Sequence, residues 1–332
     1  MNVPFLFVGK NGGSPEITIE HNESGIDILT FETVEEDPIL TGVKYEDEVH
    51  YNGKLYRVKA MDRRNGQVKV ECRLDPFKLR STFFDLKRGT DYGNSVYDLT
   101  AAVLNGAGWG MEVEGTWTGD MEALTVEERY RGSGLDILRT IHEQFGVCFR
   151  FQEETLMAAI YDPYGTDIDT PPVLLHEEVN LRDVDYKGDT YEIITRLYVY
   201  GEDENGNEIN IERVNSGNDF ITCYDYTSAA YVGVWHYDIP TTEAGLLAAG
   251  RRHIRKVCVP QESCQFDAID LYRADPEKWK NYQLTVGTVA AYYDRISKSM
   301  KRAQVTKITE TVGRPEKTVV ELAYRPILGG VG

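Results

Sequence analysis

The segment Tyr191–Gly201 reads Tyr-Glu-Ile-Ile-Thr-Arg-Leu-Tyr-Val-Tyr-Gly, an uninterrupted run of β-forming residues closed by a glycine. Nearly every residue in it favours an extended backbone, so we predict a strand here. Alternate residues of a strand point to opposite faces. One set is mostly apolar, and the other, which includes Glu192, Arg196, Tyr198 and Tyr200, mixes charge with aromatic rings. We therefore expect one face on a core and the other toward a neighbour or water.

The first 80 residues read as a string of short strands. They contain two Asn-Gly pairs, Asn52-Gly53 and Asn65-Gly66, each between β-forming segments. Asn-Gly supplies the two positive φ angles that a type I′ hairpin turn needs. The pattern predicts a meander in a small sheet or barrel.

Residues 81–175 have a different pattern. Two segments, Ser95–Asn105 and Ser133–Phe145, carry apolar residues at helical spacing, and each is followed directly by a glycine. Helix boundary signals accompany both segments: Asn94 or Ser95 as the cap of the first, Ser133 as the cap of the second, and a glycine at each end. Two short β segments follow the second helix, so we predict an α+β module with two helices on a small sheet.

Beyond Gly201 the chain mixes the two patterns. Asn205-Gly206 predicts another hairpin, and Thr242–Val257 predicts a helix that Pro260 ends. Its four cations, Arg251, Arg252, Arg255 and Lys256, fall in the last turns, where positive charge favours the negative end of the helix dipole. β-forming segments then return, which suggests two sheet domains bracketing the middle of the chain.

Composition excludes several classes of protein. The 332 residues carry 41% hydrophobic side chains and a net charge of −18, which disfavours generic nucleic-acid binding. From residue 271 onward 11 Lys and Arg face 6 Asp and Glu, so this end is positive by 5 and residues 1–270 carry −23. No segment approaches eighteen consecutive apolar residues, so we expect no membrane span. Five scattered cysteines without a Cys-x-x-Cys pair argue against zinc and against a disulfide scaffold, and for folding in a reducing cytoplasm.

The candidate catalytic and metal motifs fail on spacing. Acidic runs such as Glu202-Asp203-Glu204 lie at turns, where neighbouring carboxylates point apart, so solvated loops explain them better than a glycosidase pair. The segment from Asp203 begins like a calcium loop, but Glu208 and Val214 replace the glycine and glutamate that an EF-hand needs. His142-Glu143 opens like a metalloprotease helix, yet Gly146 stands where the second histidine belongs. We predict no catalytic, metal or cofactor residues.

The order of segments resembles the N-terminal structural region of phage tail-associated proteins, the prophage endopeptidase tail family, which shares its fold with the baseplate hubs of contractile-tailed phages. The resemblance extends from about Asp47 to Ala323 as a collinear series in which no single piece is diagnostic. The matching positions lie at the ends of both helices, before the central strand and within it: Trp109, Phe145, Gly146, Asn180, Leu181, Thr195, Arg196, Tyr200 and Gly201.

The resemblance implies an α+β, β-rich fold with two β-barrel domains. The first barrel would be residues 1–80, and the α+β module would be residues 81–175. The second barrel would combine residues 176–201 and 263–332, interrupted by an inserted subdomain at residues 202–262.

The resemblance also implies an assembly. Three chains would form a trimeric adaptor that joins the tail tube to the tip and encloses part of the DNA channel without binding DNA specifically. Partners would be the tail-tube or distal tail protein above, and tip, fibre or receptor-binding proteins below, with a tape-measure protein as a further candidate. The protein would be made in the bacterial host cytoplasm and reside at the virion tail tip or baseplate. The polar face of the central strand, Glu192, Arg196, Tyr198 and Tyr200, is the candidate subunit contact.

Two other functions stay open from the sequence. One is a cell-wall hydrolase component, which the family name and the acidity suggest. In many relatives, however, the hydrolase lies downstream of this region, and the present chain ends at Gly332, so we predict no enzyme activity. The other is a host-carbohydrate-binding adhesin. The 21 tyrosines fit the hydrolase alternative and are common at interfaces in general.

Overall fold

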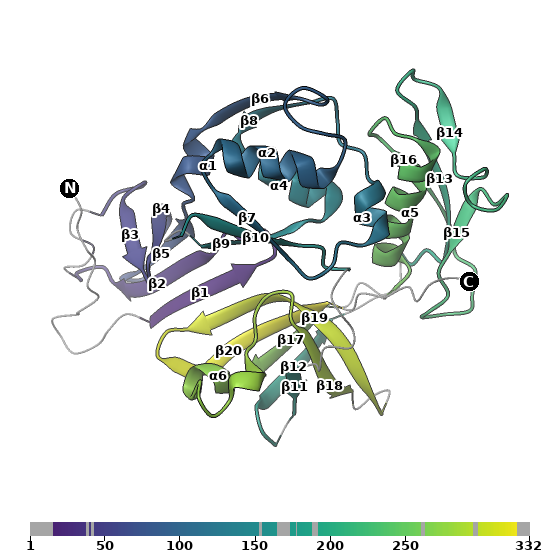
Figure 1. Ribbon diagram of the computed structural model, residues 1–332. Coiled ribbons are helices and arrows are strands. Elements are labelled where there is room, and N and C mark those ends of the chain that lie inside the picture. The colour runs from purple at the N-terminus through teal and green to yellow at the C-terminus, as the bar shows by residue number, and fades with distance from the viewer. Residues whose placement is uncertain are drawn as a thin grey trace.

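One long sheet contains both the first and the last strand that the structure describes (Figure 1). The computed structural model describes residues 16–37, 40, 43–152, 155–164, 173–176, 178–187, 192–259, 263–294 and 298–323. The main path of the sheet runs through β12 (Leu181–Lys187), β17 (Ser263–Ala268), β20 (Arg314–Ala323), β19 (Ser299–Thr311), β1 (Glu16–Asn22), β2 (Ile28–Val34), β5 (Gln67–Leu74), β4 (Lys54–Arg64) and β3 (Glu48–Tyr51). Two further strands, β11 (Val173–Leu175) and β18 (Val289–Asp294), extend it beside β19.

The N-terminal part of this sheet follows directly from its sequence. Along β5, Val68, Val70, Cys72 and Leu74 are buried while the residues between them lie nearer the solvent, as the two-residue period of a strand requires. Asn52 and Gly53 connect β3 to β4, and Asn65 and Gly66 connect β4 to β5, all four with positive φ. Both predicted hairpins are confirmed.

The two predicted barrels are not separate sheets. β1 pairs with β2 on one side and with β19 on the other, in register from Thr18 opposite Thr311 to Asn22 opposite Lys307. The N-terminal and C-terminal strands therefore form one continuous sheet, and no closed barrel forms within the described ranges. We call the β1–β19 pairing the seam.

The predicted α+β module is present in the upper part of Figure 1. Its two main helices are α2 (Val96–Gly106) and α4 (Gly134–Phe145), and its sheet is β7 (Gly110–Glu114), β10 (Met157–Tyr161) and β9 (Cys148–Gln152). The smaller elements are α1 (Phe77–Ser81), α3 (Gly119–Ala123) and the pair β6 (Phe83–Lys87) and β8 (Arg129–Ser133). Ser95 and Ser133 cap α2 and α4 through their side chains, as predicted.

The central strand belongs to a different sheet from the one predicted. Strand β13 (Arg196–Glu202) pairs with β14 (Glu208–Asn210), β15 (Phe220–Thr222) and β16 (Val232–Tyr237), and not with the C-terminal strands. The assignment of residues 176–201 to a second barrel is therefore wrong for β13. A strong strand pattern specifies an extended backbone but not its pairing partner, which is chosen by distant residues.

The strand is also shorter than the segment that predicts it. Glu192–Thr195 precede β13 in irregular backbone, and Tyr191 lies outside the described residues. The inserted unit, residues 192–259, thus begins about ten residues before the predicted boundary. The predicted hairpin at Asn205-Gly206 connects β13 to β14, and the predicted helix is α5 (Glu243–Val257) with Thr242 as its cap. In Figure 1 this unit lies to one side, in green.

The buried apolar side chains of the described residues form two hydrophobic cores. The larger one runs from the N-terminal strands through the module into the inserted unit, where Leu197, Val199 and Leu246 belong to it. The smaller one holds the strands β11, β12 and β17–β20, and includes Phe266, Val305 and Val320 but no residue of β13. The smaller unit is completed by α6 (Leu271–Ala274) and a 3₁₀ turn at Lys280–Tyr282.

Within the described part of the chain, no helix has the length and apolar character that crossing a bilayer demands.

Candidate assembly surface

Thr195 organises the start of β13. It is fully buried, and its hydroxyl donates to the Ala229 carbonyl at 2.7 Å while accepting the Tyr231 amide at 2.9 Å. Its backbone carbonyl accepts the Cys223 amide at 3.0 Å. One threonine therefore aligns the segments that lead into or out of β15 and β16, which explains why a polar residue occupies a buried position.

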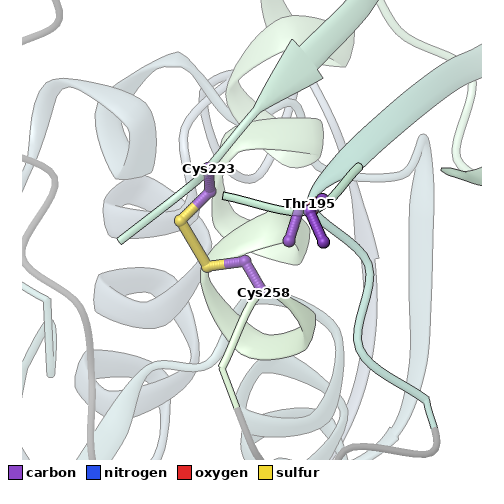
Figure 2. The surroundings of a disulfide bond; sticks show 4 residues. Thr195, Cys223 and Cys258 are labelled. Carbon is purple, nitrogen blue, oxygen red and sulfur yellow. A yellow bond between two sulfur atoms is a disulfide. The ribbon is translucent and has the colours of Figure 1, made fainter. Parts of the chain in front are cut away.

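A disulfide joins the sheet to the end of α5. Figure 2 shows Cys223 bonded to Cys258, with Thr195 beside it. The two Cα atoms are 5.9 Å apart and the residues are 35 apart in sequence. The sequence argument against a disulfide scaffold misses this pair, because scattered spacing does not reveal which residues the fold brings together. Cys72 and Cys148 are buried and are not disulfide-bonded.

The polar face predicted for the central strand is the outward face of the four-stranded sheet. Arg196, Tyr198 and Tyr200 stand in register with Val232, Val234 and His236 of β16, so all six share one side. Phe220 of β15 lies opposite Tyr198. Glu192 is exposed but lies before the strand, outside the sheet.

Rings and charge are ordered on this side. Phe220 packs against Tyr198 with a centroid distance of 5.5 Å, and the Arg196 guanidinium lies 4.8 Å from the Phe220 centroid. Val232 and Val234 beside them are 61% and 70% exposed. We call Arg196, Tyr198, Phe220, Val232 and Val234 the outer face.

Helix α5 covers the opposite side of the same sheet. Leu197 and Val199 are fully buried there, and a Cβ on Gly250 of the helix would lie 2.8 Å from Val199. A Cβ on Gly201 would lie 3.0 Å from a Leu246 methyl group. Glycine at both positions lets helix and sheet approach closely, which leaves the outer face as the unpacked side.

A buried ion pair fixes α5 to the α+β module. Arg252 donates to both carboxylate oxygens of Asp162 at 3.0 Å and to the Phe145 carbonyl at 2.8 Å. Both side chains are at least 94% buried, and Thr118 donates to the same carboxylate. The interpretation of Arg252 as a cation serving the helix dipole is therefore wrong, because this arginine turns inward to a partner 90 residues away.

The remaining signature positions are structural and spread over several units. Trp109 packs edge-on against Phe151 at 5.5 Å, Phe145 fills the core, and Gly146 ends α4 with φ of 72°. Asn180 is buried, accepting the His176 amide at 2.8 Å and donating to the Leu174 carbonyl at 3.0 Å.

Leu181 belongs to the smaller core. The fold thus brings together only the β13 members of the predicted set.

Sequence reasoning missed an ionic cluster at the seam. His21 lies 3.0 Å from Asp27 and 3.5 Å from Glu310, while Lys54 approaches Asp27 and Arg273 approaches Glu310. Burial alone would lower the pKa of His21, but its hydrogen bonds to the two carboxylates outweigh burial and raise the pKa to about 9. These residues come from four distant segments, so no sequence signal could have grouped them.

A cavity of about 280 Å³ adjoins this cluster, between the seam, β9–β10 and residues 270–286. His21, Asp27, Lys54, Arg273 and Glu310 of the cluster all line it.

The motifs dismissed on spacing have ordinary structural roles. Asp203 accepts the amides of Asn205 and Asn207, each at 2.8 Å, as a turn residue does. His142 lies 2.8 Å from the Val147 carbonyl through its Nδ1. Among the described residues, no group of three or more His, Cys, Asp or Glu side chains is arranged to hold a metal ion.

Comparison with known proteins gives this arrangement a context. Residues 169–325 match the prophage endopeptidase tail family. The match confirms the resemblance found in the sequence and spans the smaller unit together with the inserted unit. No curated protein matches the chain.

Three solved tail proteins have a similar fold. The 43 kDa tail protein of prophage MuSo2 from Shewanella oneidensis aligns with a TM-score of 0.60 and 11% identity, over 94% of each chain. A tail protein from Neisseria meningitidis has a TM-score of 0.60 and 10% identity, over 94% of this chain and 91% of the other. Prophage tail protein gp18 from Listeria monocytogenes has a TM-score of 0.56 and 12% identity, over 92% and 87%. At these identities the likeness shows a shared fold.

Proposed function

We propose that this chain is a structural component of a phage or prophage tail tip, acting as a trimeric adaptor between the tail tube and the distal tip. The observation that carries the proposal is the prophage tail-protein fold, similar over more than nine-tenths of the chain. The family match over residues 169–325 supports the same role. Tail-tube and tip proteins would be the neighbours above and below.

The architecture suits a ring built from two related units per chain. The N-terminal strands of one unit and the C-terminal strands of the other meet at the seam, and each unit has its own packed side. We propose that three chains arrange these six barrel-like units around a central channel. On this division the first unit keeps its predicted limits of 1–80, β11 joins the second unit and not the α+β module, and the inserted unit occupies residues 192–259.

Charge would suit a channel that passes DNA. Three copies would carry a formal charge of −54, three times −18. Like charges repel, so an acidic lumen would keep DNA from adhering during ejection. Lys and Arg along the inner wall of the assembled ring would argue against this role.

We propose that the adaptor works without catalysis. Turbidity of purified bacterial cell walls measures this directly, and we expect no clearing by the chain. Clearing that a single Asp or Glu substitution abolishes would identify a hydrolase instead.

The assembly itself is tested by native mass spectrometry of the purified chain. We expect a complex of three chains across the micromolar range. A chain that stays monomeric at every concentration and salt would contradict the adaptor.

A further inference from the structure

Two exposed apolar surfaces lie on different units of the molecule. One is the outer face of the inserted unit, defined above. The other, which we call the hairpin patch, consists of Leu174, Tyr293 and Met300 on β11, β18 and β19, exposed by 39%, 50% and 55%. Tyr293 and Met300 are direct cross-strand partners, and Leu174 stands opposite Ala291, two residues from Tyr293 on the same side. The smaller core packs against the reverse side, so the patch faces outward.

The segments that supply the two surfaces have opposite net charge. Residues 192–238, which supply the outer face, contain nine Asp and Glu against two Arg. Residues 289–294 and 298–302, which include β18 and the start of β19, contain three Lys and Arg against one Asp. Asp238, next to the outer face, is 98% exposed at its side chain. Apolar centres rimmed by opposite charges are the composition of a specific protein contact.

We propose that the outer face of one copy packs on the hairpin patch of the next copy, in a head-to-tail contact. This proposal rests on the proposed homotrimer and specifies how its subunits meet. A contact between two different surfaces is heterologous, and it closes into a ring when the rotation between copies is one third of a turn. Tyr198, Phe220 and Tyr293 supply the large rings that concentrate binding energy at the centre of such contacts.

Charge excludes the simpler alternative, in which two outer faces meet each other. That contact would bring two strongly acidic segments together, and like-charge juxtaposition opposes association. The hairpin patch meeting itself would oppose two basic hairpins in the same way. Only a contact between an outer face and a hairpin patch brings opposite charges together at both surfaces.

Two variants, each lacking one surface, test the contact. Variant A carries Val232→Asp and Val234→Asp, and variant B carries Tyr293→Asp and Met300→Asp. All four side chains are at least half exposed, so folding should be preserved, which circular dichroism and thermal unfolding would check. Val34→Asp is a matched control, since Val34 is 53% exposed at the end of β2, outside both surfaces.

We expect the wild type and the control to form trimers in native mass spectrometry, and A and B to be monomers when alone. Mixing A with B should give a complex of one A and one B, because one intact outer face and one intact hairpin patch remain to pair. High salt should weaken wild-type assembly.

The alternatives are separable. If A is monomeric while B still forms trimers, the outer face pairs with something other than the hairpin patch, and the proposal is wrong. If both variants still form trimers, the contact lies elsewhere although the adaptor survives. A monomeric wild type contradicts both the adaptor and the contact. Should the aspartate variants misfold, Val234→Ser and Met300→Ser are the milder pair, each expected to weaken assembly at least tenfold.

Discussion

The inserted unit and the seam connect their parts of the molecule in different ways. The inserted unit is held to the α+β module by the buried ion pair between Arg252 and Asp162, and the Cys223–Cys258 disulfide braces the unit internally. The seam is held by a five-residue strand pairing and by a partly exposed cluster around His21. Removing one partner of a buried ion pair leaves an uncompensated charge and lowers stability strongly. The charges of a cluster near solvent, by contrast, change with pH. We therefore expect the inserted unit to be a rigid platform and the seam to be the adjustable junction.

Loss of the buried ion pair should have the largest effect. Arg252→Ala leaves the Asp162 carboxylate buried without its cation, which should lower the free energy of unfolding by about 3–5 kcal/mol. Urea unfolding monitored by tryptophan fluorescence measures the change. Arg251→Ala is the matched control, because Arg251 is 46% exposed and lies 3.6 Å from Asp120; we expect less than about 1 kcal/mol there. Equal losses for both variants would show that α5 is not anchored through Arg252.

Removal of the disulfide should come next. The bond closes a loop between residues 35 apart, so its loss should lower the free energy of unfolding by about 2–4 kcal/mol. Wild type treated with dithiothreitol should be destabilised about as much as the untreated double variant Cys223→Ala/Cys258→Ala. The reductant should leave the variant unchanged. A wild type unaffected by reductant under unfolding conditions would mean that the bond contributes no stability.

Loss of the Thr195 hydroxyl should lower the free energy of unfolding less than loss of the disulfide, but more than the small size of the group suggests. Thr195→Val keeps the shape of the side chain but leaves the Tyr231 amide without its acceptor, at a cost of about 1–3 kcal/mol. Thr222→Val on β15 is the control, since Thr222 is only partly buried opposite Arg196. Hydrogen exchange should show faster exchange at Tyr231 in Thr195→Val. Unchanged exchange there would remove Thr195 from its organising role.

The smallest effect is the pH dependence of the seam. The folded pKa of His21 is about 9, above its ordinary value of 6.5, so its stabilisation is complete below about pH 6.5 and is lost as pH rises through 9. Allowing for solvent at this partly exposed ring, we expect stability to fall by about 1–2 kcal/mol between these values. His21→Gln should lack this decline. An identical pH profile for wild type and variant would separate His21 from the seam.

How much of the fold the sequence predicts depends on how local each feature is. Capped helices at Ser95 and Ser133 and hairpins at Asn52-Gly53 and Asn65-Gly66 are determined by neighbouring residues, and all are predicted correctly. The strands that pair with β13 are not predicted correctly, because Arg196–Glu202 would suit any sheet with one covered face.

The same distinction applies to the candidate surface. Alternation along β13 correctly places Arg196, Tyr198 and Tyr200 on one side, since a strand has a period of two. Phe220 and Val234, which complete the outer face, come from strands whose pairing is non-local. The Cys223–Cys258 pair and the His21 cluster are likewise products of the folded chain, and no spacing in the sequence reveals them.

The central claim is that three copies close into a ring around an acidic channel. Electron cryomicroscopy of the purified chain at the concentration where native mass spectrometry detects association tests it most directly. We predict threefold particles with an open centre, Asp and Glu along the inner wall, and the outer face of each copy covered by its neighbour. Single-chain particles, or a ring whose inner wall is lined by Lys and Arg, would contradict the account.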